Sequence, residues 1–135
     1  MPYSYKINSY NGNNKGTFYI QSKGLHAGRP LRVPIANCFT VVTDEPFLFE
    51  RIYSLYVGKY FSFYIGGSVV PFIRIDDVKR VIEAAADQEP RPCEKDLTAI
   101  HNIDKLLQNI EQQKKLYKNI QFSLARKVNG KERRI

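Results

Sequence analysis

Alternation of apolar and polar residues marks the start of the chain. Residues 3–9 (YSYKINS) repeat with the period of a strand that has one wet face. Residues 11–14 (NGNN) form a turn signal, and residues 17–22 (TFYIQS) are rich in strand-forming side chains. The two runs therefore predict an N-terminal β-hairpin.

A strand followed by a helix is predicted next. Residues 37–43 (NCFTVVT) are mostly apolar, and Asp44 stands before a run whose apolar positions have helical spacing up to Gly58. Aspartate favours the N-cap of a helix and glycine favours its end. The aromatic run 59–65 fits either a strand or a continuation of the helix.

A second short helix is predicted after a glycine-rich break. Gly66-Gly67-Ser68 precedes the extended run 69–73, which carries Pro71 and fits a sheet edge. Asp76 or Asp77 then caps a helix that reaches Ala86. The prolines of QEPRP end it and begin a linker.

The longest periodic pattern lies at the C-terminal end. Residues 94–128 hold neither Gly nor Pro, and apolar side chains recur at close to 3.6 residues, which predicts one helix of roughly 50 Å. Read as heptads, one row of the seam turns polar halfway. The helix either pairs with a partner or packs on its own domain.

These elements predict an α+β fold: a small mixed sheet with the N-terminal hairpin, two short helices and one long C-terminal helix. The expected organisation is an α+β recognition-like domain (1–88), a linker (89–93), the long amphipathic helix (94–128) and a basic tail (129–135). A chain of 135 residues fits one domain with an appendage.

Charge is concentrated at both ends of the chain. Residues 1–43 hold five cations and no carboxylate, residues 44–92 have a net charge of −2, and residues 93–135 have a net charge of +5. Such an uneven distribution favours a polyanionic partner, because neutralised phosphates release counterions. Charge that serves solubility alone is the other explanation.

Candidate binding residues follow from this distribution. Loop 23–34 carries four basic or imidazole side chains without an acid, and the run 59–64 mixes a lysine with aromatics that either stack on bases or fill the core. The candidate nucleic-acid-binding residues are Lys23, His26, Arg29, Arg32, Lys59, Arg74, Lys114 and Lys118.

The pattern gives little support to catalysis. Cys38 and Cys93 lack the spacing of a redox or zinc motif, and neither histidine is paired with a nucleophile by any motif. Asp77-Val78-Lys79 has the D-x-K spacing of a metal-dependent nuclease, but a helix-capping aspartate explains it with less effort. We expect no catalytic residue, metal or cofactor.

The run from Gly66-Gly67-Ser68 through Pro71-Phe72-Ile73 to residues 76–81 (DDVKRV), followed by a long helix, resembles the target-recognition domain and spacer helix of type I restriction-modification DNA-specificity subunits. The resemblance covers about residues 37–128 and corresponds to half of such a subunit. It implies DNA recognition and a helix that pairs with a second copy or a methyltransferase subunit. The runs SKG, GRPL, NCF and PFIRIDD are also similar to small uncharacterised Bacteroidetes proteins.

The resulting hypothesis is a non-catalytic DNA-binding module, either a specificity or an accessory module. The alternative is a protein–protein adaptor or inhibitor that acts through residues 94–128, and a homodimer or a helical partner protein is expected there. No apolar run approaches the roughly 20 residues that span a bilayer, and no signal segment stands out, so a cytoplasmic protein is expected.

Overall fold

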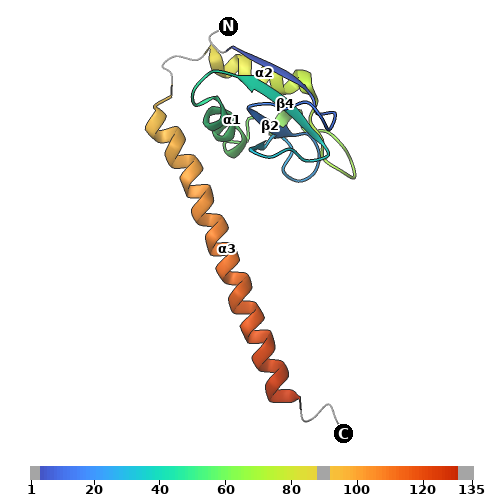
Figure 1. Cartoon of the computed structure of the whole chain (residues 1–135), viewed down its shortest axis with the longest axis vertical. Coiled ribbons are helices and arrows are strands. Elements are labelled where there is room, and N and C mark those ends of the chain that lie inside the picture. Colours follow the sequence, from blue (N-terminus) through green and yellow to red (C-terminus); the bar gives the residue numbers. More distant parts are fainter. Residues whose placement is uncertain (1–3, 88–91, 131–135) are drawn as a thin grey trace. The chain divides into compact units, whose positions relative to one another are not determined.

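The protein was analysed as a computed structural model that describes residues 4–87 and 92–130. The chain divides into two compact units, Met1–His101 and Asn102–Ile135. The first unit contains a four-stranded sheet and two helices, and the second consists of most of a long helix (Figure 1). The α+β class and the long C-terminal helix agree with the sequence prediction.

The sheet is antiparallel throughout, with the strand order β1-β4-β2-β3. Its strands are β1 (Tyr5–Ser9), β2 (Phe18–Gln21), β3 (Pro30–Leu31) and β4 (Cys38–Thr43). The prediction of a mixed sheet was therefore wrong in strand direction. No parallel pair occurs among these strands, and the connections between them are loops.

The predicted N-terminal hairpin was also wrong, because β4 lies between β1 and β2. Ile7 pairs with Val41 on one side of β4, and Phe18 pairs with the same valine on the other side. The connection runs back along β4, since the N–H of Tyr10 donates to the carbonyl of Cys38 and the N–H of Thr17 donates to the carbonyl of Val41. Asn11 and Asn14 brace this connection through hydrogen bonds of 2.8–2.9 Å. β4 is buried along most of its length, and such a strand is stabilised more at the centre of a sheet than at its edge.

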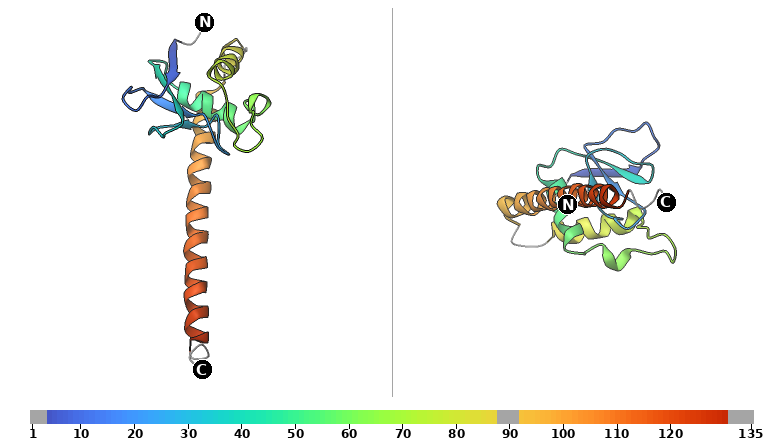
Figure 2. Two further views of the ribbon diagram at one scale, coloured as in Figure 1. Left: turned by 90° about the vertical axis from the view of Figure 1, so that its right-hand side faces the viewer. Right: turned by 90° about the horizontal axis from the view of Figure 1, so that it is seen from below.

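Both short helices cover one face of the sheet (Figure 2). Helices α1 (Leu48–Val57) and α2 (Ile75–Ala86) supply apolar side chains to the same core as the inward-facing strand residues. Each fully buried aliphatic or aromatic side chain contributes about 1.5–3 kcal/mol. The largest of these are Phe18, Phe61, Ile20, Leu48, Ile52, Ile82, Val41 and Val78.

The helix starts differ from those expected. The N-cap of α1 is Phe47, which has a left-handed backbone (φ 66°), and no side chain caps it. Asp44 precedes this turn by three residues and is not the cap. The N-cap of α2 is Arg74, while Asp76 and Asp77 lie in the first turn, where carboxylates favour the positive end of the helix dipole. Gly58 ends α1 as predicted.

The undecided segments are short and irregular. Residues Ser62–Tyr64 form one 3₁₀ turn, and the run 69–73 forms a bridge only at Phe72. Helix α3 (Glu94–Asn129) has nearly the predicted bounds. Residues 89–91 of the predicted linker (89–93) and residues 131–135 of the predicted basic tail (129–135) lie outside the described residues.

Candidate nucleic-acid interface

The loop after β2 is attached to the segment before α2 by backbone hydrogen bonds. The N–H of Ile73 donates to the carbonyl of Ser22 at 2.9 Å, and the N–H of Gly24 donates to the carbonyl of Pro71 at 2.8 Å. Lys23 thus forms an antiparallel bridge with Phe72, two residues before Arg74. Two cations that are fifty residues apart in sequence come to lie on neighbouring segments.

The same loop also contacts the end of α1. The ring Nδ1 of His26 lies 3.0 Å from the hydroxyl of Tyr56. Gly28 has a φ of +95°, and a Cβ built on it would lie 3.1 Å from the ring of Phe61, so this glycine permits the close approach. Leu25 and Lys59 line a shallow pocket of about 250 Å³ at this junction.

We call the surface formed by residues 22–28, 57–65 and 66–74 the loop face. Three of its apolar side chains are almost fully exposed: Leu25 (88%), Phe63 (88%) and Val69 (90%). The loop face therefore combines cations with accessible aromatic and aliphatic side chains.

Four of the eight candidate binding residues belong to the loop face: Lys23, His26, Lys59 and Arg74. All four are exposed. Lys23 and Arg74 are held by the bridged backbone, whereas Lys59 follows Gly58 with a left-handed backbone (φ 65°). The sequence predicted these residues individually, and the fold brings them together.

Arg32 is engaged elsewhere. Its guanidinium lies 3.3 Å from the carboxylate of Glu50 and 3.7 Å above the ring of Phe49. Arg29 is half-buried, and its carbonyl accepts a hydrogen bond from the N–H of Gln21. Arg32 therefore contacts α1 with a side chain that is 57% exposed, and Arg29 is joined to β2 through its backbone.

The remaining candidates, Lys114 and Lys118, belong to the second unit. Both are exposed on α3. With Lys115, they make the middle of α3 basic.

Sequence reasoning missed the apolar members of the loop face. Leu25, Val69 and Val70 stand in glycine-rich loops, where an aliphatic side chain has no periodic neighbours that would assign it to a core. This lack of periodic apolar neighbours is the sequence signal that could have identified the three side chains as exposed. The aromatic run was ambiguous, and its members divide: Phe61 is buried while Phe63 is exposed.

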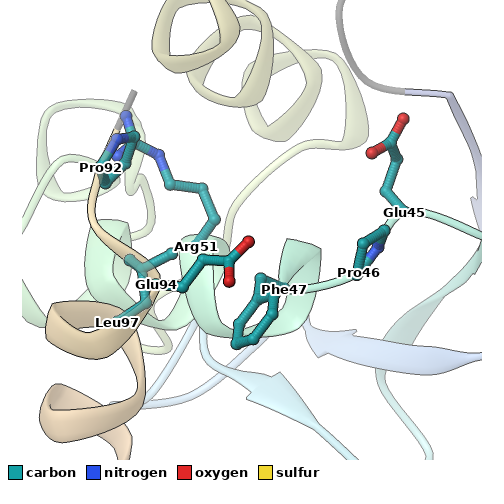
Figure 3. A pocket seen from close by; sticks show the side chains of 7 residues that line it. All are labelled: Glu45, Pro46, Phe47, Arg51, Pro92, Glu94 and Leu97. Carbon is teal, nitrogen blue, oxygen red and sulfur yellow. The ribbon is translucent and has the colours of Figure 1, made fainter. Parts of the chain in front are cut away.

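A second pocket, of about 150 Å³, lies between the start of α1 and the start of α3 (Figure 3). Its lining residues are Glu45, Pro46, Phe47, Arg51, Pro92, Glu94 and Leu97. Arg51 is buried, and its Nη2 donates to the carbonyl of Ala85 at 3.4 Å. Leu97 is buried as well, so this pocket borders a packing contact within the first unit.

Groups that would carry chemistry are poorly arranged for it. Burial raises the pKa of the Cys38 thiol, which outweighs the hydrogen bond that the thiol donates to the carbonyl of Ile35, and only a thiolate is a strong nucleophile. Asp77 lies 3.5 Å from Arg80 on α2. Among residues 4–87 and 92–130, no three His, Cys, Asp or Glu side chains gather into a metal site.

The fold and surface define a small α+β protein with a cationic, partly apolar loop face and a long amphipathic helix. The chain belongs to a family of unknown function (DUF6943), whose model matches residues 4–127. No curated protein and no solved structure matches it. Within the described part of the chain, none of the helices has the length and apolar character needed to cross a membrane.

Proposed function

We propose that this protein is a non-catalytic DNA-binding module that contacts the duplex through its loop face. The observation that carries the proposal is that Lys23 and Arg74 lie on bridged segments, while Lys59 and exposed Leu25 line one pocket on the neighbouring loop. The resemblance to a type I target-recognition domain supports it, since the loop Gly66–Ser68 and the run up to Arg74 supply much of this surface.

The chemistry of the loop face suits a polyanion with apolar bases. Lysine and arginine position a protein on the phosphate backbone, and they dominate affinity. Exposed aromatic and aliphatic side chains contact base faces or the methyl group of thymine. Phosphate contacts through Lys23, Lys59 and Arg74 would place Phe63 and Leu25 near the bases.

The test compares two variants that lose the same charge. One carries Lys23→Gln, Lys59→Asn and Arg74→Gln on the loop face. The matched control carries Lys6→Gln, Lys15→Gln and Lys79→Gln, which lie on β1, the loop after it, and α2. Both variants fall from a net charge of +8 to +5.

Binding of each protein to a fluorescently labelled 20-base-pair duplex is measured by anisotropy. We expect the loop-face variant to lose affinity at least about tenfold at 0.1 M salt, while the control variant stays within about threefold of the parent protein. Equal losses would mean that net charge alone drives binding. Undetectable binding of the parent protein at about 50 mM salt would refute the proposal.

A second function, protein–protein association through α3, is favoured by a different observation. The apolar side chains along this helix are more than half exposed, from Ile103 (54%) to Val128 (77%). A helix of this kind obtains most of its stability from packing its apolar face against another element. Sedimentation velocity of the full chain tests association, and a monomer at all concentrations would count against self-association.

A further inference from the structure

Helix α3 carries an apolar stripe without a covering element among the described residues. The stripe consists of eight side chains that are 54–77% exposed and recur with the period of a helix, interrupted between Ile110 and Tyr117: Ile103, Leu106, Leu107, Ile110, Tyr117, Ile120, Leu124 and Val128. It extends over about 38 Å of helix. Nearly four heptads of such spacing are typical of a helix that pairs with another helix.

The charge along α3 is divided between its two halves. Residues 94–112 hold two cations and four anions, for a net charge of −2, whereas residues 113–129 hold five cations and no anion. Lys114 lies on the stripe itself, in the heptad row of Leu107 and Val128. If a second copy of α3 runs in the opposite direction, its basic half lies beside the acidic half of the first copy.

Pairing of two copies in parallel would oppose these charges. Each cationic half would lie beside the other, and Lys114 would face Lys114 of the second copy within the seam. Like charges placed opposite one another destabilise a helix pair, and a buried unpaired charge costs more. Parallel pairing is therefore disfavoured by the sequence of α3.

Antiparallel pairing brings unlike charges together. The acidic half of each helix then lies along the basic half of the other. Glu111 and Lys118 occupy the same flank of the stripe, and in this orientation Lys118 of one copy faces Glu111 of the second copy. The symmetric pair forms at the same time, so each dimer gains two such contacts.

We propose that α3 binds α3 of a second copy of this chain in the antiparallel orientation, through the apolar stripe. The occupant of the stripe is thus another copy of the protein, selected by the charge reversal along the helix. The proposal stands apart from DNA binding, because it involves the second unit alone.

A charge-swap cycle on the full-length protein tests the orientation. We expect Glu111→Lys and Lys118→Glu each to weaken dimerisation roughly tenfold, because each turns two attractive pairs into repulsive ones. The double variant should return to within about threefold of the parent Kd. Within one helix the two positions are about 10.5 Å apart, so recovery reports contact between copies. Sedimentation velocity measures each Kd.

The control is Lys105→Glu, on the opposite side of the helix from the stripe. It changes the net charge by the same amount as Lys118→Glu, and we expect it to alter the Kd less than about threefold. In a parallel dimer Glu111 would face Leu106 and Lys118 would face Gln113, so the cycle would show no recovery.

A distance measurement provides a second readout. A spin label is attached at Asn129→Cys in a protein whose exposed Cys93 is replaced by serine. Two labels in an antiparallel dimer should lie about 40–50 Å apart, whereas a parallel dimer would bring them within about 25 Å.

The charge-swap cycle and the distance measurement can each overturn the proposal. A short label distance, or a cycle without recovery, would reject the antiparallel orientation. A protein that remains monomeric to about 100 µM would reject self-pairing and would make a helix of a different protein the occupant of the stripe. The effect on DNA binding is measured separately and decides neither outcome.

Discussion

Lys59 offers the sharpest test of the loop face, because its charge can be removed without disturbing its backbone. It adopts a left-handed conformation (φ 65°) immediately after the end of α1. Asparagine is one of the few residues that tolerate this conformation. Lys59→Asn should therefore leave the free energy of unfolding within about 0.5 kcal/mol of the parent protein, as is usual for exposed positions.

The expected effect on DNA binding follows from the number of phosphate contacts. Three loop-face side chains are lysine or arginine: Lys23, Lys59 and Arg74. If each neutralises one phosphate, the slope of log K against log salt is about −2.7, and affinity falls about 40-fold between 50 and 200 mM salt. Loss of one contact changes the slope to about −1.8, and the corresponding fall is about 12-fold.

The assay is a salt titration of anisotropy with a labelled duplex, run in parallel on both proteins, with urea unfolding to compare their stabilities. The reasoning would be refuted by a variant whose slope equals that of the parent protein. A variant that is destabilised by more than about 1 kcal/mol would contradict the assignment of the left-handed backbone.

Four further predictions concern stability and assembly. Burial, with a smaller contribution from the nearby carboxylate of Glu83, raises the pKa of Tyr5 from 10 to about 12. Because the folded state holds this proton more tightly than the unfolded state, the free energy of unfolding should fall as the pH rises from 10 through 12. Urea unfolding of Tyr5→Phe over the same pH range should show a smaller fall. Gly67→Ala should cost more than Gly12→Ala in urea unfolding, because both have a positive φ but only a Cβ at Gly67 would collide with the carbonyl of Val70; equal costs would show that the collision is relieved. Ile52→Ala, at a fully buried position, should cost about 2–5 kcal/mol by the same method. Lys114→Ile removes the like-charge layer of a parallel pair, so spin labels at position 129 should gain a short-distance population, and an unchanged distance distribution would contradict that role.

Local patterns of the sequence were sufficient for most elements. The alternation in residues 3–9, the apolar run 37–43 and the 3.6-residue period of 94–128 each produced the element expected from them. In each case a single segment contains the whole pattern. Gly58 ends α1 because a glycine acts on its immediate neighbours.

Long-range arrangement was not accessible in the same way. The order of strands depends on which pairings bury most apolar surface, and β4 competes successfully for both β1 and β2. The start of α1 depends on a left-handed turn at Phe47, a residue type for which such a backbone is unusual. The prediction of Asp44 as the N-cap of α1 was therefore wrong.

The candidate site was predicted in part. Its cations were recognisable from composition, but the bridge between Lys23 and Phe72 joins segments about fifty residues apart. Arg32 shows the converse: it looks like its neighbours in sequence, and only the fold reveals its contacts with Glu50 and Phe49. Residue type predicts the charge, whereas tertiary contacts decide whether the charge is available.

The central position of β4 has a consequence for how the chain acquires its structure. β1 and β2 emerge from the ribosome first, yet β1 lacks its native neighbour until residue 43 has been synthesised, since Tyr5 pairs with Thr43, and β2 has only the short strand β3 beside it until β4 follows. During that interval β1 can pair with β2, and the Asn-Gly turn between them favours a hairpin that the native sheet does not contain. Folding therefore requires β4 to displace or forestall this local pairing, which makes sheet formation the slow, non-local step of folding, whereas the backbone hydrogen bonds of α3 are all local.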